Sequence, residues 1–161
     1  MSALFALILA ATICTWLWME AEPGGQFTAA FTDPNGGGDI SETNLYVMNN
    51  VVPGTVSGWS GNECIARYDP PTNNLYVVID AGGSWSAPVP AGGSGAVSNS
   101  QCTLFGAGSS ASISGNTLTV TFNISFNTGT FAGAKQLFLT AGNSVGFTGN
   151  FQHQFGIWNV P

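Results

Sequence analysis

The stretch TLTVTFNISF, which runs from Thr117 to Phe126, is the clearest structural signal in the sequence. Apolar and polar residues alternate along it at every step. Successive side chains of a β-strand point to opposite faces, so the alternation places one apolar face against a core and one polar face in water. The apolar positions are Leu118, Val120, Phe122, Ile124 and Phe126. The stretch therefore predicts a half-buried strand of an antiparallel sheet.

Shorter β-type runs, separated by clusters of Gly, Pro, Asn and Asp, lie on both sides of this strand. We expect further strands at residues 27–32, 43–49, 64–69, 75–80, 97–105, 135–141 and 152–160. A long loop rich in Gly, Ser and Pro is expected over residues 81–95. Because this part of the sequence shows no sustained 3.6-residue repeat, it predicts an all-β fold. The expected architecture is an antiparallel, immunoglobulin-like β-sandwich of about seven to nine strands.

An apolar segment precedes the sandwich, and residues 2–18 of it carry no charge. Ala and Leu are frequent and β-branched residues are few, so we expect a helix over residues 1–19. A linker with Pro and Gly, residues 20–26, would then lead to a sandwich domain over residues 27–161.

Three interpretations of the apolar segment remain open: a secretory signal that is removed, an uncleaved membrane anchor, and a stem that packs against copies of itself. The second would bring the segment into contact with a membrane, with its tryptophans at the interface. The third would make the protein a homo-oligomer or filament. Its assembly residues would be Leu4, Phe5, Leu7, Ile8, Leu9, Ile13, Trp16, Leu17 and Trp18.

Charge is scarce throughout the chain. Charged residues make up 6% of it, the formal net charge is −6, and Arg67 and Lys135 are the only basic side chains. Nucleic-acid binding needs a footprint of Lys and Arg to displace phosphate counterions, so this class of function is excluded. The same deficit argues against an anionic membrane surface as a partner.

The three cysteines are Cys14, Cys64 and Cys102. Cys64 and Cys102 each lie beside an expected strand, and we interpret them as a disulfide pair. The alternative is two separate buried thiols. A disulfide would require an oxidising compartment, which predicts an extracellular or cell-surface protein.

Several motifs carry a resemblance to a known domain family. They are FTDPNGGGDI (31–40), NECIARYDPPTNNLYVVIDAGGSW (62–85), SNSQCTLFGAGSSASISGNTLTVTFNISF (98–126), FAGAKQLFLTAGN (131–143) and GIWNVP (156–161). In this order, over residues 26–161, the chain resembles a domain that recurs, often in tandem, in large secreted proteins of soil bacteria. Such domains resemble immunoglobulin and fibronectin type III sandwiches. The resemblance implies that Cys64 and Cys102 are paired, and it implies no enzymatic activity.

A Gly-rich loop, DPNGGGD, offers a candidate metal site. Asp33, Asn35 and Asp39 supply oxygen ligands within seven residues, and calcium is the ion that favours such ligands. The alternative is an Asp-Pro-Asn-Gly turn without a metal. We expect no other cofactor.

Two tryptophans, Trp59 and Trp85, fall in expected loops. Such side chains can stack on sugar rings and bind carbohydrate, or they can cover an open end of the core.

Catalytic machinery is not evident. His153 is the only histidine, and no G-x-S-x-G motif is present. Asp69 and Asp80 lie at strand ends, where aspartate normally bonds the local backbone. We therefore expect a protein that is not an enzyme.

Two functions remain. The first is a self-assembling surface filament subunit, pilus-like, with an apolar stem and a β-sandwich head. The second is a secreted or membrane-anchored adhesion module that binds carbohydrate or a surface partner.

Overall fold

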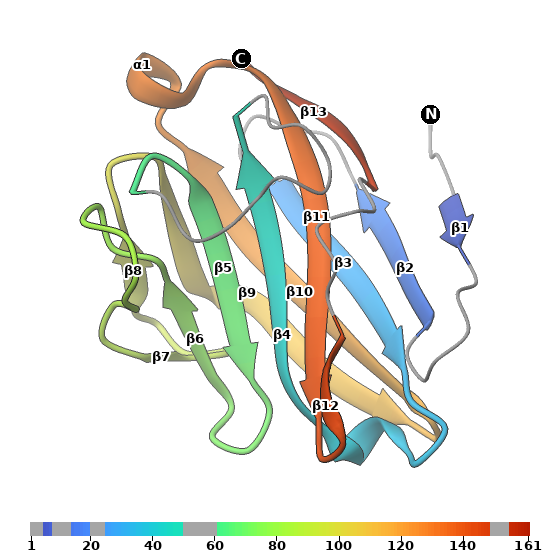
Figure 1. The fold of residues 1–161 in the computed structure, drawn as a ribbon. Coiled ribbons are helices and arrows are strands. Elements are labelled where there is room, and N and C mark those ends of the chain that lie inside the picture. Colours follow the sequence, from blue (N-terminus) through green and yellow to red (C-terminus); the bar gives the residue numbers. More distant parts are fainter. Residues whose placement is uncertain (1–4, 8–13, 20–24, 50–60, 149–154) are drawn as a thin grey trace.

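The computed structural model describes residues 5–7, 14–19, 25–49, 61–148 and 155–161. In this part of the chain, two antiparallel sheets lie face to face and enclose the core between them (Figure 1). The predicted all-β, antiparallel architecture is confirmed.

Sheet A has the strand order β1-β2-β3-β10-β9-β8. Its strands are β1 (Phe5–Leu7), β2 (Cys14–Met19), β3 (Gly25–Thr32), β8 (Ala96–Ser98), β9 (Cys102–Ser114) and β10 (Thr117–Phe126). The strand that was clearest in the sequence, β10, occupies an interior position between β3 and β9. Its residues pair with β3 from Thr117 to Ile124 without interruption, whereas the pairing with β9 contains a bulge between Thr121 and Asn123.

Sheet B has the strand order β12-β11-β4-β5-β6-β7, and β13 also pairs with β11. Its strands are β4 (Ile40–Met48), β5 (Cys64–Asp69), β6 (Asn74–Val77), β7 (Val89–Pro90), β11 (Gly133–Asn143), β12 (Gly146–Thr148) and β13 (Gly156–Val160). Two short helical turns, η1 (Gly37–Asp39) and α1 (Thr128–Phe131), connect the sheets. None of the described helices has the length and apolar character required to cross a membrane.

The core is built from alternate residues of both sheets. In β10, Leu118, Val120, Phe122 and Ile124 are buried, as the alternation predicts. Phe126 is half-buried, and its ring lies 5.9 Å from that of Phe27 and 6.0 Å from that of Phe131. Sheet B supplies the facing layer with Leu45, Val47, Ala66, Leu75, Val77, Leu137 and Leu139.

Several predicted strands differ from the observed ones: β12 (Gly146–Thr148) was not expected, and β6 ends at Val77 instead of residue 80. The loop expected over residues 81–95 contains the short strand β7, which pairs with β6. The strand expected over 97–105 is two strands, β8 and β9, and β9 continues to Ser114. Its Gly- and Ser-rich second half has low β-propensity, but pairing with β10 supplies its backbone partners, so tertiary context decides.

The helix expected over residues 1–19 is wrong for the residues that the structure describes. Phe5–Leu7 and Cys14–Met19 are strands, and β2 pairs with β3 from Cys14↔Thr32 to Met19↔Phe27. The sequence of β2, CTWLWM, contains Thr and two Trp, which favour strands. Backbone pairing along β3 outweighs the helix propensity of the neighbouring Ala and Leu residues.

Candidate functional site

The disulfide between Cys64 and Cys102 is confirmed, with the two Cα atoms 5.7 Å apart. Cys64 begins β5 in sheet B and Cys102 begins β9 in sheet A, so the bond joins the two layers. Both residues are buried in the core.

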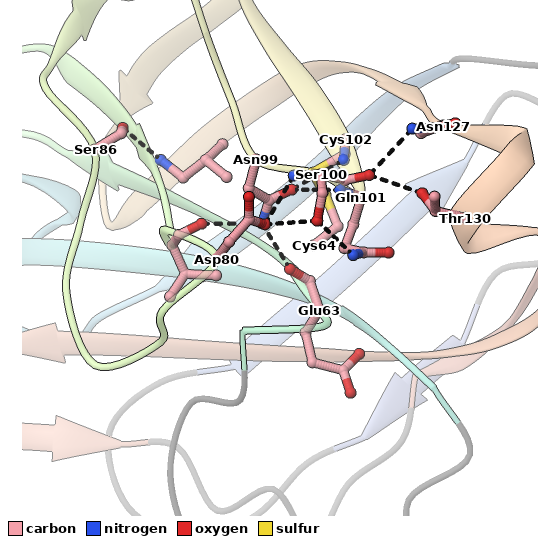
Figure 2. Close-up of a disulfide and its surroundings, with 12 residues drawn as sticks. Glu63, Cys64, Asp80, Ser86, Asn99, Ser100, Gln101, Cys102, Asn127 and Thr130 are labelled. Atoms are coloured by element: carbon pink, nitrogen blue, oxygen red, sulfur yellow. Dashed lines mark hydrogen bonds between the residues drawn. A yellow bond between two sulfur atoms is a disulfide. The ribbon is translucent and has the colours of Figure 1, made fainter.

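A polar junction surrounds this disulfide (Figure 2). The Oδ1 atom of Asn99 accepts hydrogen bonds from the backbone N–H groups of Gln101 and Cys102, at 2.9 and 3.0 Å. Its Nδ2 group donates to the carbonyl oxygens of Glu63 and Val78, each at 2.9 Å. One side chain thus holds the start of β9 against sheet B. Its bonding serves the fold and leaves no group directed at a ligand.

Asp80 lies at the exposed edge of the same junction. Its Oδ1 atom accepts bonds from the backbone N–H and the Oγ hydroxyl of Ser100, at 2.8 and 2.7 Å. These two bonds from Ser100 hold the pKa of the Asp80 carboxyl below its ordinary value. The Asp69 carboxylate instead interacts with Arg67 and Thr72. Because Asp69 and Asp80 serve separate local networks, they do not form a cooperating acid–base pair.

The candidate calcium loop has an internal hydrogen-bond network. Asp33 is buried; its Oδ1 atom accepts from the Asn35 N–H at 2.8 Å and its Oδ2 atom accepts from Asn143 Nδ2 at 2.6 Å. Asp39 accepts from Ser144 at 2.9 Å. Both oxygens of Asp33 thus have protein partners, as in the turn interpretation. Within the described ranges, no group of three or more His, Cys, Asp or Glu is placed to hold a metal, and calcium binding stays a prediction.

The other predicted site residues fall in different parts of the chain. Trp59 and His153 lie outside the described residues, as do Leu4, Ile8, Leu9 and Ile13 of the assembly set. Phe5 and Leu7 are in β1, and Trp16, Leu17 and Trp18 are in β2. Trp85 is described. It forms a bridge with Val78 and packs, half-buried, against the outer face of sheet B.

That outer face carries the strongest candidate site, which we call the Arg67 cluster: Glu42, Arg67, Asp69, Tyr76 and Trp85. Arg67 Nη1 lies 3.0 Å from Glu42 Oε2, and Arg67 Nη2 lies 3.6 Å from Asp69 Oδ1. The guanidinium also lies 5.6 Å from the ring centroid of Trp85. Tyr76 is the cross-strand partner of Arg67 on β6. The cluster therefore combines two aromatic side chains with three charged ones on four segments.

A polar row, buried at Thr140 and Asn44 and half-buried at Arg67, runs into the cluster. Thr140, Asn44 and Arg67 occupy paired positions on β11, β4 and β5. The Nδ2 group of Asn44 donates to Thr140 Oγ1 at 3.0 Å and to Glu42 Oε1 at 3.1 Å. A chain of hydrogen bonds and ion pairs therefore connects Thr140 to Asp69 through Asn44, Glu42 and Arg67. Such a chain fixes the positions of the partly exposed carboxylates.

Two buried polar atoms of this row have no hydrogen-bond partner in the described part of the chain. They are Oδ1 of Asn44, a residue that is 1% exposed, and Nε of Arg67. A buried polar group without a partner costs about 1–3 kcal/mol. Both atoms are buried beneath the surface, so they mark a local energetic cost beside the Arg67 cluster and not a point of ligand contact.

The apolar half of the same face is fully packed. Tyr46, Met48, Ile65, Val78 and Phe138 are buried and form a second cluster, with Trp85 against it. Burial raises the pKa of the Tyr46 hydroxyl, whose oxygen lies 3.5 Å from Thr140 Oγ1. Trp85 thus lies between this packed half and the charged half of the face.

Sequence reasoning found Trp85 but missed its partners. Glu42 and Asn44 are two residues apart on β4, and Arg67 and Asp69 are two apart on β5. This spacing puts each pair on one face of its strand, which was a usable signal. The spacing alone does not reveal the cross-strand register, which pairs Asn44 with Arg67.

Comparisons of the chain with protein-family models, with curated proteins and with solved structures find no match. The resemblance to the secreted domains of soil bacteria stays a prediction. The case for a function therefore depends on the residues and their geometry.

Proposed function

We propose that the protein is an extracellular, non-enzymatic binding module that recognises carbohydrate through the Arg67 cluster. The observation that carries the proposal is the concentration of charge. Three of the chain's few ionisable side chains, Glu42, Arg67 and Asp69, meet beside Trp85 on one sheet face. Charged residues make up only 6% of the chain. Three of them gathered on one half-buried surface contribute little to solubility, so their grouping favours a role in binding.

The chemistry of the cluster supports carbohydrate as the ligand. An indole ring offers an apolar face that the C–H groups of a pyranose can cover. Carboxylates accept hydrogen bonds from hydroxyl groups, and charge-assisted bonds of this kind are stronger than neutral ones. Trp85, Glu42 and Asp69 provide both elements on adjoining segments.

The immunoglobulin-like fold is part of the proposal, and the strand order supports it. In their spatial order within the sheets, β2-β3-β10-β9 of sheet A corresponds to A-B-E-D, and β13-β11-β4-β5-β6 of sheet B corresponds to G-F-C-C′-C″. The disulfide differs from that of antibody domains, because it joins the C′ and D positions rather than B and F. A disulfide that links the sheets supports an extracellular or cell-surface location.

A direct test is to screen the full chain against a glycan array and to measure each interaction by titration calorimetry. We expect at least one glycan to bind, and Trp85→Ala to weaken its binding at least about tenfold, which is about 1.4 kcal/mol. Ile113→Ala is the control, because Ile113 is an exposed apolar residue on β9 of sheet A, in the sheet that does not carry the Arg67 cluster. Absence of any bound glycan, or equal binding by the Trp85→Ala variant, would overturn the proposal.

A filament subunit is the second candidate, and the pairing of β2 with β3 favours it. β2 lies next to β1, and β1 and β8 are the two edge strands of sheet A. An edge strand of one copy that pairs with the other edge of the next copy would extend into an open filament. In this form the N-terminal segment acts as a strand, not as a helical stem. Sedimentation velocity of the full chain at micromolar concentration should then show species larger than the monomer. A monomer alone would exclude this candidate.

A further inference from the structure

One edge of sheet B is formed by β12 and β13, which both pair with β11 on the side opposite β4. Among the described strands, β13 pairs with β11 alone (Figure 1). Alternate residues of such an edge strand direct their backbone N–H and C=O groups away from the sheet. The far side of β13 is therefore a template on which one more strand can pair.

The strands that end the two sheets differ in how well they are protected against such pairing. Natural proteins protect sheet edges with very short strands, proline or charged side chains. β1, β8 and β12 have three residues each, and β7 has two, of which one is Pro90 and lacks an N–H group. β13 has five residues, GIWNV, with neither proline nor charge. It is the least protected of these strands.

Exposed apolar side chains gather along the same edge. Four large hydrophobic residues of the described chain are exposed, and three of them, Val145, Phe147 and Ile157, lie on or next to β12 and β13. Ile157 is 65% exposed and pairs with Gln136, whereas the next residue, Trp158, packs in the core. Ile157 is thus on the outer face of sheet B, where a partner strand would remove apolar surface from water.

The absence of charge along this edge favours a second copy of the chain as the partner. Residues 144–161 contain no Asp, Glu, Lys or Arg. Each chain carries a formal charge of −6, so two copies repel each other least where neither presents a charged side chain. An antiparallel edge strand also matches itself across a two-fold axis, because the donors of each strand face the acceptors of the other.

We propose that the protein forms a dimer in which β13 pairs antiparallel with β13 of a second copy and Ile157 lies opposite its symmetry mate. The Cβ atoms of directly opposite residues are about 4.5–5.5 Å apart, so the two isoleucines cover each other. Because both copies use the same edge, assembly stops at two chains, unlike an open filament. A contact of one short strand is small, so the dimer is reversible.

Sedimentation equilibrium of the full chain, over a series from micromolar to millimolar concentration, measures this dimer. We expect the average mass to rise with concentration and to level off at two chains. Ile157→Lys should raise the dissociation constant at least about tenfold, because like charges directly opposite each other destabilise a strand pair. Ile113→Lys is the matched control: it replaces an exposed isoleucine on the part of β9 that β8 does not cover, and it should leave the dimer unchanged.

A charge exchange at the same position tests the register. The Ile157→Lys and Ile157→Glu variants should each be monomeric alone, and their equimolar mixture should recover the dimer, because lysine then faces glutamate across the axis. Circular dichroism of each variant should match that of the wild type.

A wild-type protein that stays monomeric at millimolar concentration would overturn the proposal, as would a mass that grows beyond two chains. A dimer that Ile157→Lys leaves intact, or a mixture of folded variants that stays monomeric, would also overturn it. These outcomes are independent of the glycan binding proposed for the Arg67 cluster, which the Trp85→Ala variant tests.

Discussion

The outer faces of the two sheets differ in composition and in burial. On sheet A, most outward side chains of β3 and β10 are hydroxylic and partly exposed. Two pairs bond to each other: Thr28 with Thr121 at 2.9 Å and Thr32 with Thr117 at 3.1 Å. On sheet B, the outward side chains Tyr46, Ile65 and Phe138 are 2% exposed or less. Sheet A therefore has one buried and one wet face, whereas the central strands of sheet B are buried on both.

This difference explains where a ligand site can form. On the wet face of sheet A, four threonines bond to each other, and none of the buried unsatisfied atoms of the described residues lies on β3 or β10. The outer face of sheet B is buried over one half and charged over the other. At the border between the halves, Asn44 Oδ1 and Arg67 Nε are shielded from water but have no hydrogen-bond partner. The Arg67 cluster lies at that border, next to Trp85.

The largest effect on stability is expected from removing a side chain from the buried outer face of sheet B. Phe138→Ala should lower the free energy of unfolding by about 3–5 kcal/mol, because it leaves a cavity among packed residues. The matched change on sheet A, Thr121→Ala, should cost less than about 1 kcal/mol. Urea denaturation measures both values. A Phe138→Ala variant as stable as the wild type would mean that this face is not packed.

The disulfide joins the two sheets, so its removal tests whether they depend on each other. The double substitution Cys64→Ala and Cys102→Ala should lower the free energy of unfolding by about 2–5 kcal/mol. Reduction of the wild-type protein should produce a similar loss, and it serves as the control. Unchanged stability after both treatments would show that the hydrophobic core alone fixes the sheets.

A smaller effect is expected at the exposed edge of the disulfide junction. The folded-state pKa of Asp80 is lowered by its two bonds from Ser100. Its ionised form therefore stabilises the fold above the unfolded-state pKa of about 3.9, and this contribution is lost as the pH falls through the lower folded-state pKa. The Asp80→Asn variant should therefore have a lower melting temperature than the wild type near neutral pH.

The difference in melting temperature between the Asp80→Asn variant and the wild type should shrink as the pH falls through the acidic range. Calorimetric scans across that range measure it, with Asp39→Asn as a comparison carboxylate. A difference in melting temperature that does not depend on pH would show that the charge of Asp80 does not stabilise the fold.

The sequence predicted one kind of strand well. β10 was found with its observed bounds because alternation marks a strand with one wet face. The bounds of β5 and the partners of the disulfide were also correct. These features depend on local pattern or on a small number of cysteines.

The features that were missed depend on contacts that are distant in sequence. Asn44 and Thr140 bond across 96 residues, so neither the buried row nor the Arg67 cluster leaves a local pattern. β2 was expected as helix because its pairing with β3, not its own propensity, decides its conformation. The central strands β4 and β11 of sheet B contain short apolar runs, LYVM and LFL, and such runs do not show which face of the strand is outward.

The central claim is that ligand binds to the outer face of sheet B and not to that of sheet A. It is tested most directly by recording amide chemical shifts of the full chain during titration with the oligosaccharide that binds best. We predict that shifts concentrate at Glu42, Arg67, Tyr76 and Trp85, while Thr28, Thr119 and Thr121 stay unchanged. Shifts confined to the threonine face of sheet A would contradict the account.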